Sequence, residues 1–120
     1  MIGFETFFSK LAYHLADLGA LTLFPFSEEG HLFVTVKESG ETFALEPRFK
    51  DVMEHVMAID AESLWPDMDP LTAKMSLFSV HVDEAVSLAS EGAHLLSWGD
   101  RGLEARHGVL PPSVTAQKKV

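Results

Sequence analysis

The chain contains no cysteine among its 120 residues. A disulfide, a thiolate nucleophile and a cysteine-ligated zinc or iron–sulfur site are therefore excluded. No stretch approaches the roughly 18 consecutive apolar residues of a membrane-spanning helix. The first 20 residues alternate apolar and polar side chains, which is typical of an amphipathic helix and not of a signal peptide. We therefore expect a cytoplasmic protein.

Basic residues are also scarce. The chain has nine Lys and Arg residues and eighteen Asp and Glu residues, which gives a net charge of −9. Residues 1–107 contain seven of the basic residues and all eighteen acidic residues, which gives a net charge of −11. This acidity disfavours binding to nucleic acid and to anionic membranes. It indicates a surface complementary to a protein partner with a basic surface. The alternative interpretation is that the acidity is only the general acidity of a soluble protein and does not serve a partner.

Hydrophobic residues make up 47% of the chain, enough for one domain to bury a core without metals or crosslinks. The clearest element is a helix from Asp69 to Gly92. Asp69 suits the N-cap, Pro70 the first helical position, and Gly92 the C-terminal end. Apolar residues at steps of three and four form one stripe: Leu71, Met75, Phe78, Val82, Ala85, Val86 and Ala89. A strand over Met75–Val82 is the competing interpretation.

The remaining elements follow from apolar periodicity and turn residues. They are a helix at 3–18, strands at 21–26, 31–38 and 41–46, a short helix at 48–58, and strands at 93–98 and 103–107. A two-residue Ser39-Gly40 loop would pair Val36 with Phe43, and a three-residue loop at 28–30 would pair Phe24 with Val34. Both registers gather the same apolar residues on one face: Phe24, Phe26, Leu32, Val34, Val36, Phe43 and Leu45.

This order predicts an α+β fold. We expect an antiparallel sheet of about five strands, a β-meander plus a C-terminal hairpin, covered by the N-terminal helix and the long central helix. Residues 1–107 would form this single domain and 108–120 a flexible tail, because the tail is rich in Pro, Ser, Thr and Lys. An unpaired apolar strand edge could also form a homodimer.

The run from His81 to Glu84 is the most suggestive group of ionisable residues. His81 and Glu84 lie one turn apart on the predicted helix and share an edge. They could bind a ligand or act as an acid–base pair, together with His55 or His94. The alternative is a histidine that only packs beside the apolar stripe. Metal sites need three or four converging ligands, and no second motif supplies them.

A second candidate is the segment Trp98-Gly99-Asp100-Arg101-Gly102. It is typical of a hairpin turn, because no strand, glycine-rich loop and helix surround it as in a phosphate site. If Trp98 is exposed, this turn becomes a binding edge that includes Asp100 and Arg101.

No nucleophile elbow, P-loop or catalytic spacing occurs in the chain. Small, acidic, cysteine-free proteins include toxin-neutralising immunity proteins and secretion chaperones. The order helix, three strands, helix is similar to that of type III secretion chaperones, although the long helix at 70–91 departs from it.

We therefore expect a non-catalytic protein-interaction module without cofactor or metal. Its acidic face would include Glu28, Glu29, Glu38, Glu41, Asp83 and Glu84. The alternative is a small ligand-binding or hydrolytic domain that uses the pair His81 and Glu84. Asp83 is a further candidate residue of the interaction or ligand site.

Overall fold

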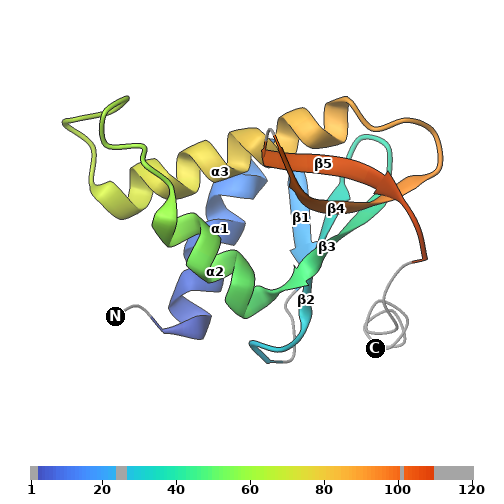
Figure 1. Ribbon diagram of the computed structural model, residues 1–120, viewed down its shortest axis with the longest axis horizontal. Helices are drawn as coiled ribbons and strands as arrows, with labels where there is room; N and C mark the ends of the chain where they lie inside the picture. Colours follow the sequence, from blue (N-terminus) through green and yellow to red (C-terminus); the bar gives the residue numbers. More distant parts are fainter. Residues whose placement is uncertain (1–2, 24–26, 101, 110–120) are drawn as a thin grey trace.

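The computed structural model describes residues 3–23, 27–100 and 102–109, which form three helices and five strands (Figure 1). In chain order these are α1 (Phe4–Asp17), β1 (Ala20–Leu23), β2 (His31–Val36), β3 (Thr42–Arg48), α2 (Phe49–Ala58), α3 (Pro70–Ser87), β4 (Ala93–Gly99) and β5 (Gly102–His107). The predicted α+β class is confirmed. Phe24, Phe26, Arg101 and the tail beyond Val109 lie outside the described residues.

The five strands form one sheet in the order β1-β2-β3-β4-β5. β3 and β4 are parallel, and the other neighbouring pairs are antiparallel. The prediction of a purely antiparallel sheet is therefore wrong. Between β3 and β4 the chain passes through both α2 and α3, and a helical crossover of this kind returns the next strand in the same direction.

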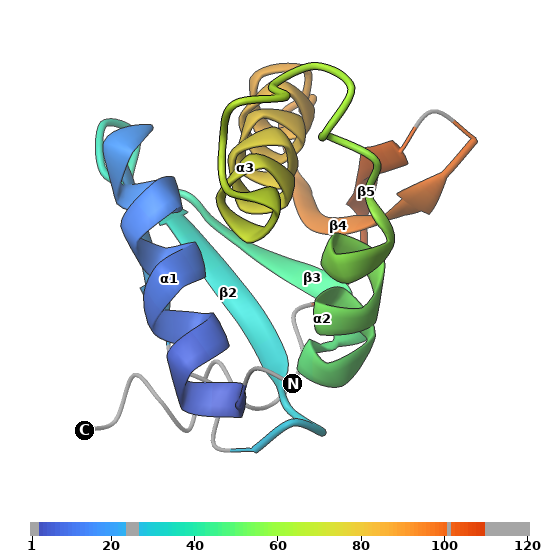
Figure 2. The ribbon, with the colours of Figure 1, turned by 90° about the vertical axis from the view of Figure 1, so that its left-hand side faces the viewer.

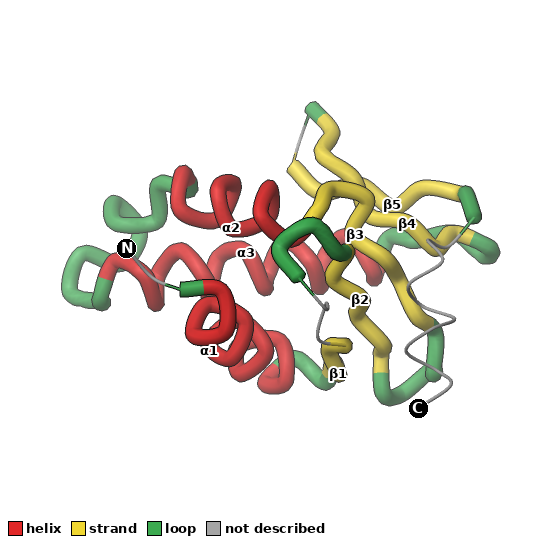
Figure 3. Tube along the Cα trace, turned by 90° about the horizontal axis from the view of Figure 1, so that it is seen from below, coloured by secondary structure: helices red, strands yellow, loops and turns green. Residues whose placement is uncertain are grey.

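The three helices lie on one side of a curved sheet, with α3 between α1 and α2 (Figures 2 and 3). The predicted apolar face is confirmed for its described members, because Leu32, Val34, Phe43 and Leu45 are buried in the main core and Val36 packs at its margin. The helices contribute most of the other buried core residues: Phe7, Leu11, Leu15, Phe49, Val52, Val56, Met75, Phe78, Val82 and Ala85. All three helices therefore cover the sheet, whereas the sequence predicted that only α1 and α3 would cover it.

The hairpin between β2 and β3 has a longer connection than predicted. Val34 lies opposite Phe43, so the expected pairing of Val36 with Phe43 is wrong by two residues. The Val36 N–H donates to the Glu41 carbonyl at 2.9 Å, and the Gly40 N–H donates to the Val36 carbonyl at 2.7 Å. Four residues therefore lie between Val36 and its partner Glu41, and Gly40 takes a φ of +74°, which glycine adopts without strain.

The pairing of β1 with β2 is shifted in the same way. Thr22, and not Phe24, lies opposite Val34. Side chains alternate between the two faces of a strand, so a shift of two residues leaves each side chain on its original face. The sequence therefore predicts which residues reach the core even where it misplaces their partners across the sheet.

The N-terminus of α3 follows the predicted capping pattern. The Asp69 carboxylate accepts hydrogen bonds from the Thr72 N–H at 3.1 Å and from the Thr72 hydroxyl at 3.3 Å, and Pro70 is the first helical residue. The helix ends at Ser87, earlier than expected, and Gly92 takes its φ of +89° in the turn before β4. The competing strand interpretation is wrong. Over the described parts of the chain, no helix has the length and hydropathy needed to cross a lipid bilayer.

We expect Asp69→Ala to lower the free energy of unfolding by about 1 kcal/mol, because the first turn of α3 loses its side-chain acceptor. Chemical denaturation measures this change. Asp67→Ala is the matched control, since it removes an exposed carboxylate two residues earlier, and it should cost less than about 0.5 kcal/mol. Equal losses in the two variants would contradict the capping role.

Candidate functional site

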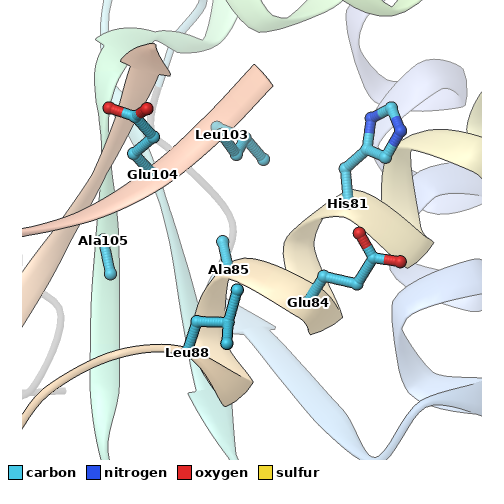
Figure 4. A pocket seen from close by; sticks show the side chains of 7 residues that line it. All are labelled: His81, Glu84, Ala85, Leu88, Leu103, Glu104 and Ala105. Atoms are coloured by element: carbon cyan, nitrogen blue, oxygen red, sulfur yellow. The ribbon is translucent and has the colours of Figure 1, made fainter. Parts of the chain in front are cut away.

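A groove of about 380 Å³ lies between the second half of α3 and strand β5 (Figure 4). Its lining residues, which define the α3–β5 groove, are His81, Glu84, Ala85, Leu88, Leu103, Glu104 and Ala105. The helical wall uses positions i, i+3, i+4 and i+7, which share one side of an α-helix. The other wall is a continuous piece of β5. The groove therefore combines a helix flank with the last strand of the sheet.

His81 and Glu84 both line this groove, as their helical spacing predicts. Figure 4 shows the two side chains projecting from the same flank of α3. No hydrogen bond joins them in the described structure. Within residues 3–23, 27–100 and 102–109, no group of three or more His, Asp or Glu side chains is arranged to hold a metal ion. The helical wall thus presents one imidazole and one carboxylate beside an apolar floor.

Glu104 borders the groove from the opposite side. Leu103 and Ala105 pack against the main core, so alternation along β5 places the Glu104 side chain on the other face of the sheet. A Cβ atom added at Gly99 would overlap the Glu104 carboxylate, which shows that this side chain lies across Gly99. Its carboxylate points away from His81 and Glu84 (Figure 4). The two glutamates therefore flank the groove and do not converge within it.

Trp98 lies in a cluster of aromatic rings that joins β4 to α2 and α3. Its ring stacks on His55 with centroids 3.9 Å apart and an interplanar angle of 16°. Phe78 meets both rings edge-on, at 6.1 Å from His55 and 6.4 Å from Trp98. Trp98 is half-buried against the core, so the exposed aromatic edge considered from the sequence is not formed. Asp100 remains exposed at the turn, and Arg101 lies outside the described residues.

Burial lowers the pKa of His55, and the nearby charge of His81 lowers it further. Burial acts in this direction because it penalises the charged imidazolium. His55 therefore binds a proton less readily in the folded protein than in the unfolded chain. At pH values near these two pKa values, the unfolded chain then binds more protons than the folded protein. The free energy of unfolding therefore rises with pH in this range.

We expect the contribution of His55 to stability to be complete above the unfolded pKa of about 6.5 and to be lost as the pH falls through the lower folded pKa. Unfolding measured between pH 7.5 and 5 in wild type and His55→Gln should show a shallower loss of stability in the variant. His94→Gln is the control, because His94 lies outside the ring cluster. An unchanged pH slope in His55→Gln would rule out this linkage.

The six acidic residues expected to share one face are separated in the fold. Asp83 lies on the other flank of α3, where it lines a second pocket together with Glu38. Glu28 and Glu29 precede β2, whereas Glu38 and Glu41 follow it, and a strand of this length separates the two pairs by about 17 Å. A contiguous acidic face built from these six residues stays a prediction. Of the six, Glu84 alone lines the α3–β5 groove.

Ion pairs occupy several of the basic side chains that the structure describes. Arg48 and Lys50 both pair with Glu29, which lowers the pKa of that carboxyl. Two further ion pairs join Lys74 to Glu62 at 3.6 Å and Arg106 to Glu46 at 3.2 Å. None of the lysines and arginines in the described ranges lines the α3–β5 groove. The carboxylates at its two sides are therefore available to an external cation.

Comparison with known proteins places the chain in no family. No family model matches it, and no match is found among the curated proteins or the solved structures.

Proposed function

We propose that this chain is a small, acidic, non-catalytic protein-interaction module that binds a basic protein through the α3–β5 groove. The observation that carries the proposal is an apolar groove flanked by the carboxylates of Glu84 and Glu104, with no described lysine or arginine in its lining. Apolar contacts at the centre of an interface supply affinity, and complementary charges around them select the partner.

Leu88 supports the same conclusion. Its side chain is 85% exposed at the end of α3, beside the apolar residues Ala85 and Leu103 that also line the groove. A large exposed apolar side chain next to an apolar groove gains free energy when a partner covers it. The immunity proteins and secretion chaperones named above are small acidic proteins that act by binding another protein. The absence of cysteine is compatible with the cytoplasmic location that we propose for the module.

The alternative is a ligand-binding or hydrolytic domain that uses His81 and Glu84. Its support is that both side chains line the same groove. The two functions differ in which residue contributes most to binding or turnover. A ligand or substrate site predicts that His81→Ala abolishes binding or turnover, whereas the interaction module predicts that the exposed apolar residue Leu88 contributes more than His81.

We expect Leu88→Ser to weaken partner binding by about tenfold, because it removes an apolar contact residue of the groove. The partner is captured from the native host on the immobilised wild-type chain, identified, and titrated calorimetrically against each variant. Tyr13→Ser is the matched control, since Tyr13 is also exposed, at 68%, but lies on α1.

The melting temperatures of both variants should stay close to that of the wild type, because both side chains are largely exposed. A partner without a basic surface would contradict the proposed function. Equal affinity of wild type and Leu88→Ser would contradict the assignment of the groove.

A further inference from the structure

The strand β5 forms one edge of the sheet. It pairs with β4 on one side, and antiparallel pairing turns the N–H and C=O of alternate residues toward the other side. Among the described residues, no backbone group of another element forms a hydrogen bond to this outer edge. The edge therefore offers a row of donors and acceptors to an added strand.

The α3–β5 groove runs along this same strand. In Figure 1, α3 passes beside β5, and the two elements are in contact. Leu103 and Ala105 face the helical side of the sheet, whereas Glu104 faces the opposite side. A strand added to β5 would therefore have one row of side chains toward α3 and the other row on the Glu104 side.

We propose that β5 binds an extended segment of the partner as a sixth strand, in which apolar and basic residues alternate. This inference rests on the proposed function and specifies its binding mode. The apolar side chains pack against Ala85 and Leu88 of α3, beside Leu103. The basic side chains lie on the far side of the sheet, the side that carries Glu104.

Charge complementarity favours a basic segment as the occupant. Arg106 lies on the same side of β5 as Glu104, but it already pairs with Glu46 at 3.2 Å. Glu104 forms no ion pair within the described part of the chain. The six residues of β5 extend over about 20 Å, which matches a segment of five or six residues.

The test uses synthetic octapeptides and the full chain. The probe alternates Val and Lys, and a block peptide with four Val followed by four Lys has the same composition and charge. Affinity is measured by calorimetry, and hydrogen exchange of the β5 amides is followed by NMR. We expect the alternating peptide to bind more than about tenfold more tightly and to protect alternate amides of residues 102–107.

Two N-methylated forms of the alternating peptide give the sharpest control. The amides of Val and Lys in this peptide point to opposite edges of an extended strand, so only one set can face β5. Methylation of one set should reduce affinity more than about tenfold, and methylation of the other set should leave it within about threefold. A strand added to β5 requires this asymmetry, whichever set faces the protein.

The outcomes separate the binding mode from the proposed function. Equal affinity of the alternating and block peptides, or equal effects of the two methylations, would overturn strand addition while binding to a basic partner remained. Protection of β5 at high protein concentration without peptide, together with a dimer in sedimentation, would show a second copy on this edge and would also overturn it. If neither peptide binds and the captured partner is not basic, the proposed function itself fails.

Discussion

A Phe49→Ala variant is expected to lose about 3–5 kcal/mol of unfolding free energy, the usual range for removing a fully buried phenylalanine. Phe49 is completely buried at the start of α2, directly after β3. Its ring meets those of Phe4, Phe7 and Phe8 edge-on, with centroid distances of 5.1, 5.7 and 6.1 Å. The substitution therefore leaves a cavity among three rings of α1 and loosens the contact between the first helix and the crossover.

Met57→Ala is the matched control for this experiment. It lies on the same helix but is 45% exposed, so its loss should stay below about 1 kcal/mol. Urea denaturation of both variants gives the comparison. Small domains are stable by only about 5–15 kcal/mol, so Phe49→Ala should remove a large part of the free energy of unfolding. Similar midpoints for the two variants would show that the Phe49 cluster is not a centre of the core.

The double variant Glu84→Lys/Glu104→Lys is expected to weaken binding of the basic partner by about 100-fold, because each change places a like charge against the partner. The two carboxylates flank the α3–β5 groove on its two sides. Both side chains are exposed, so the fold should be retained. Circular dichroism verifies the fold, and calorimetry measures the dissociation constant.

Glu28→Lys/Glu41→Lys has the same change in net charge and is the control. These exposed residues lie at the two ends of β2, outside the lining of the groove. It should weaken binding only several-fold, through the long-range field, and this effect should disappear at high salt. Equal losses in the two double variants would mean that total charge, and not the groove, determines binding.

Local sequence signals predicted the elements and faces of this fold well. Asp69-Pro70 defines the start of α3 through a hydrogen bond and a fixed backbone angle, both of which depend on neighbouring residues. Val34 and Phe43 lie on the core side because alternation along a strand survives a register shift of two residues. Short-range chemistry thus determined which side chains are buried.

The arrangement of elements that lie far apart in the sequence was harder to predict. The parallel pairing of β3 with β4 depends on how α2 and α3 pack between the two strands. No turn motif in the sequence indicates the direction in which β4 runs. Leu103 and Ala105 join His81 in one groove only because β5 ends the sheet beside α3. The stacking of His55 on Trp98 joins residues that are far apart in the sequence, so periodicity within either segment does not show it.

The most direct test of the central claim is an NMR titration of the isotope-labelled full chain with its captured partner. If the α3–β5 groove is the binding surface, the largest amide shift changes fall on residues 81–88 of α3 and 102–107 of β5. Residues 28–30 and 37–41, at the two ends of β2, should change little. The largest changes at the ends of β2, or small changes spread over the whole acidic surface, would contradict the account.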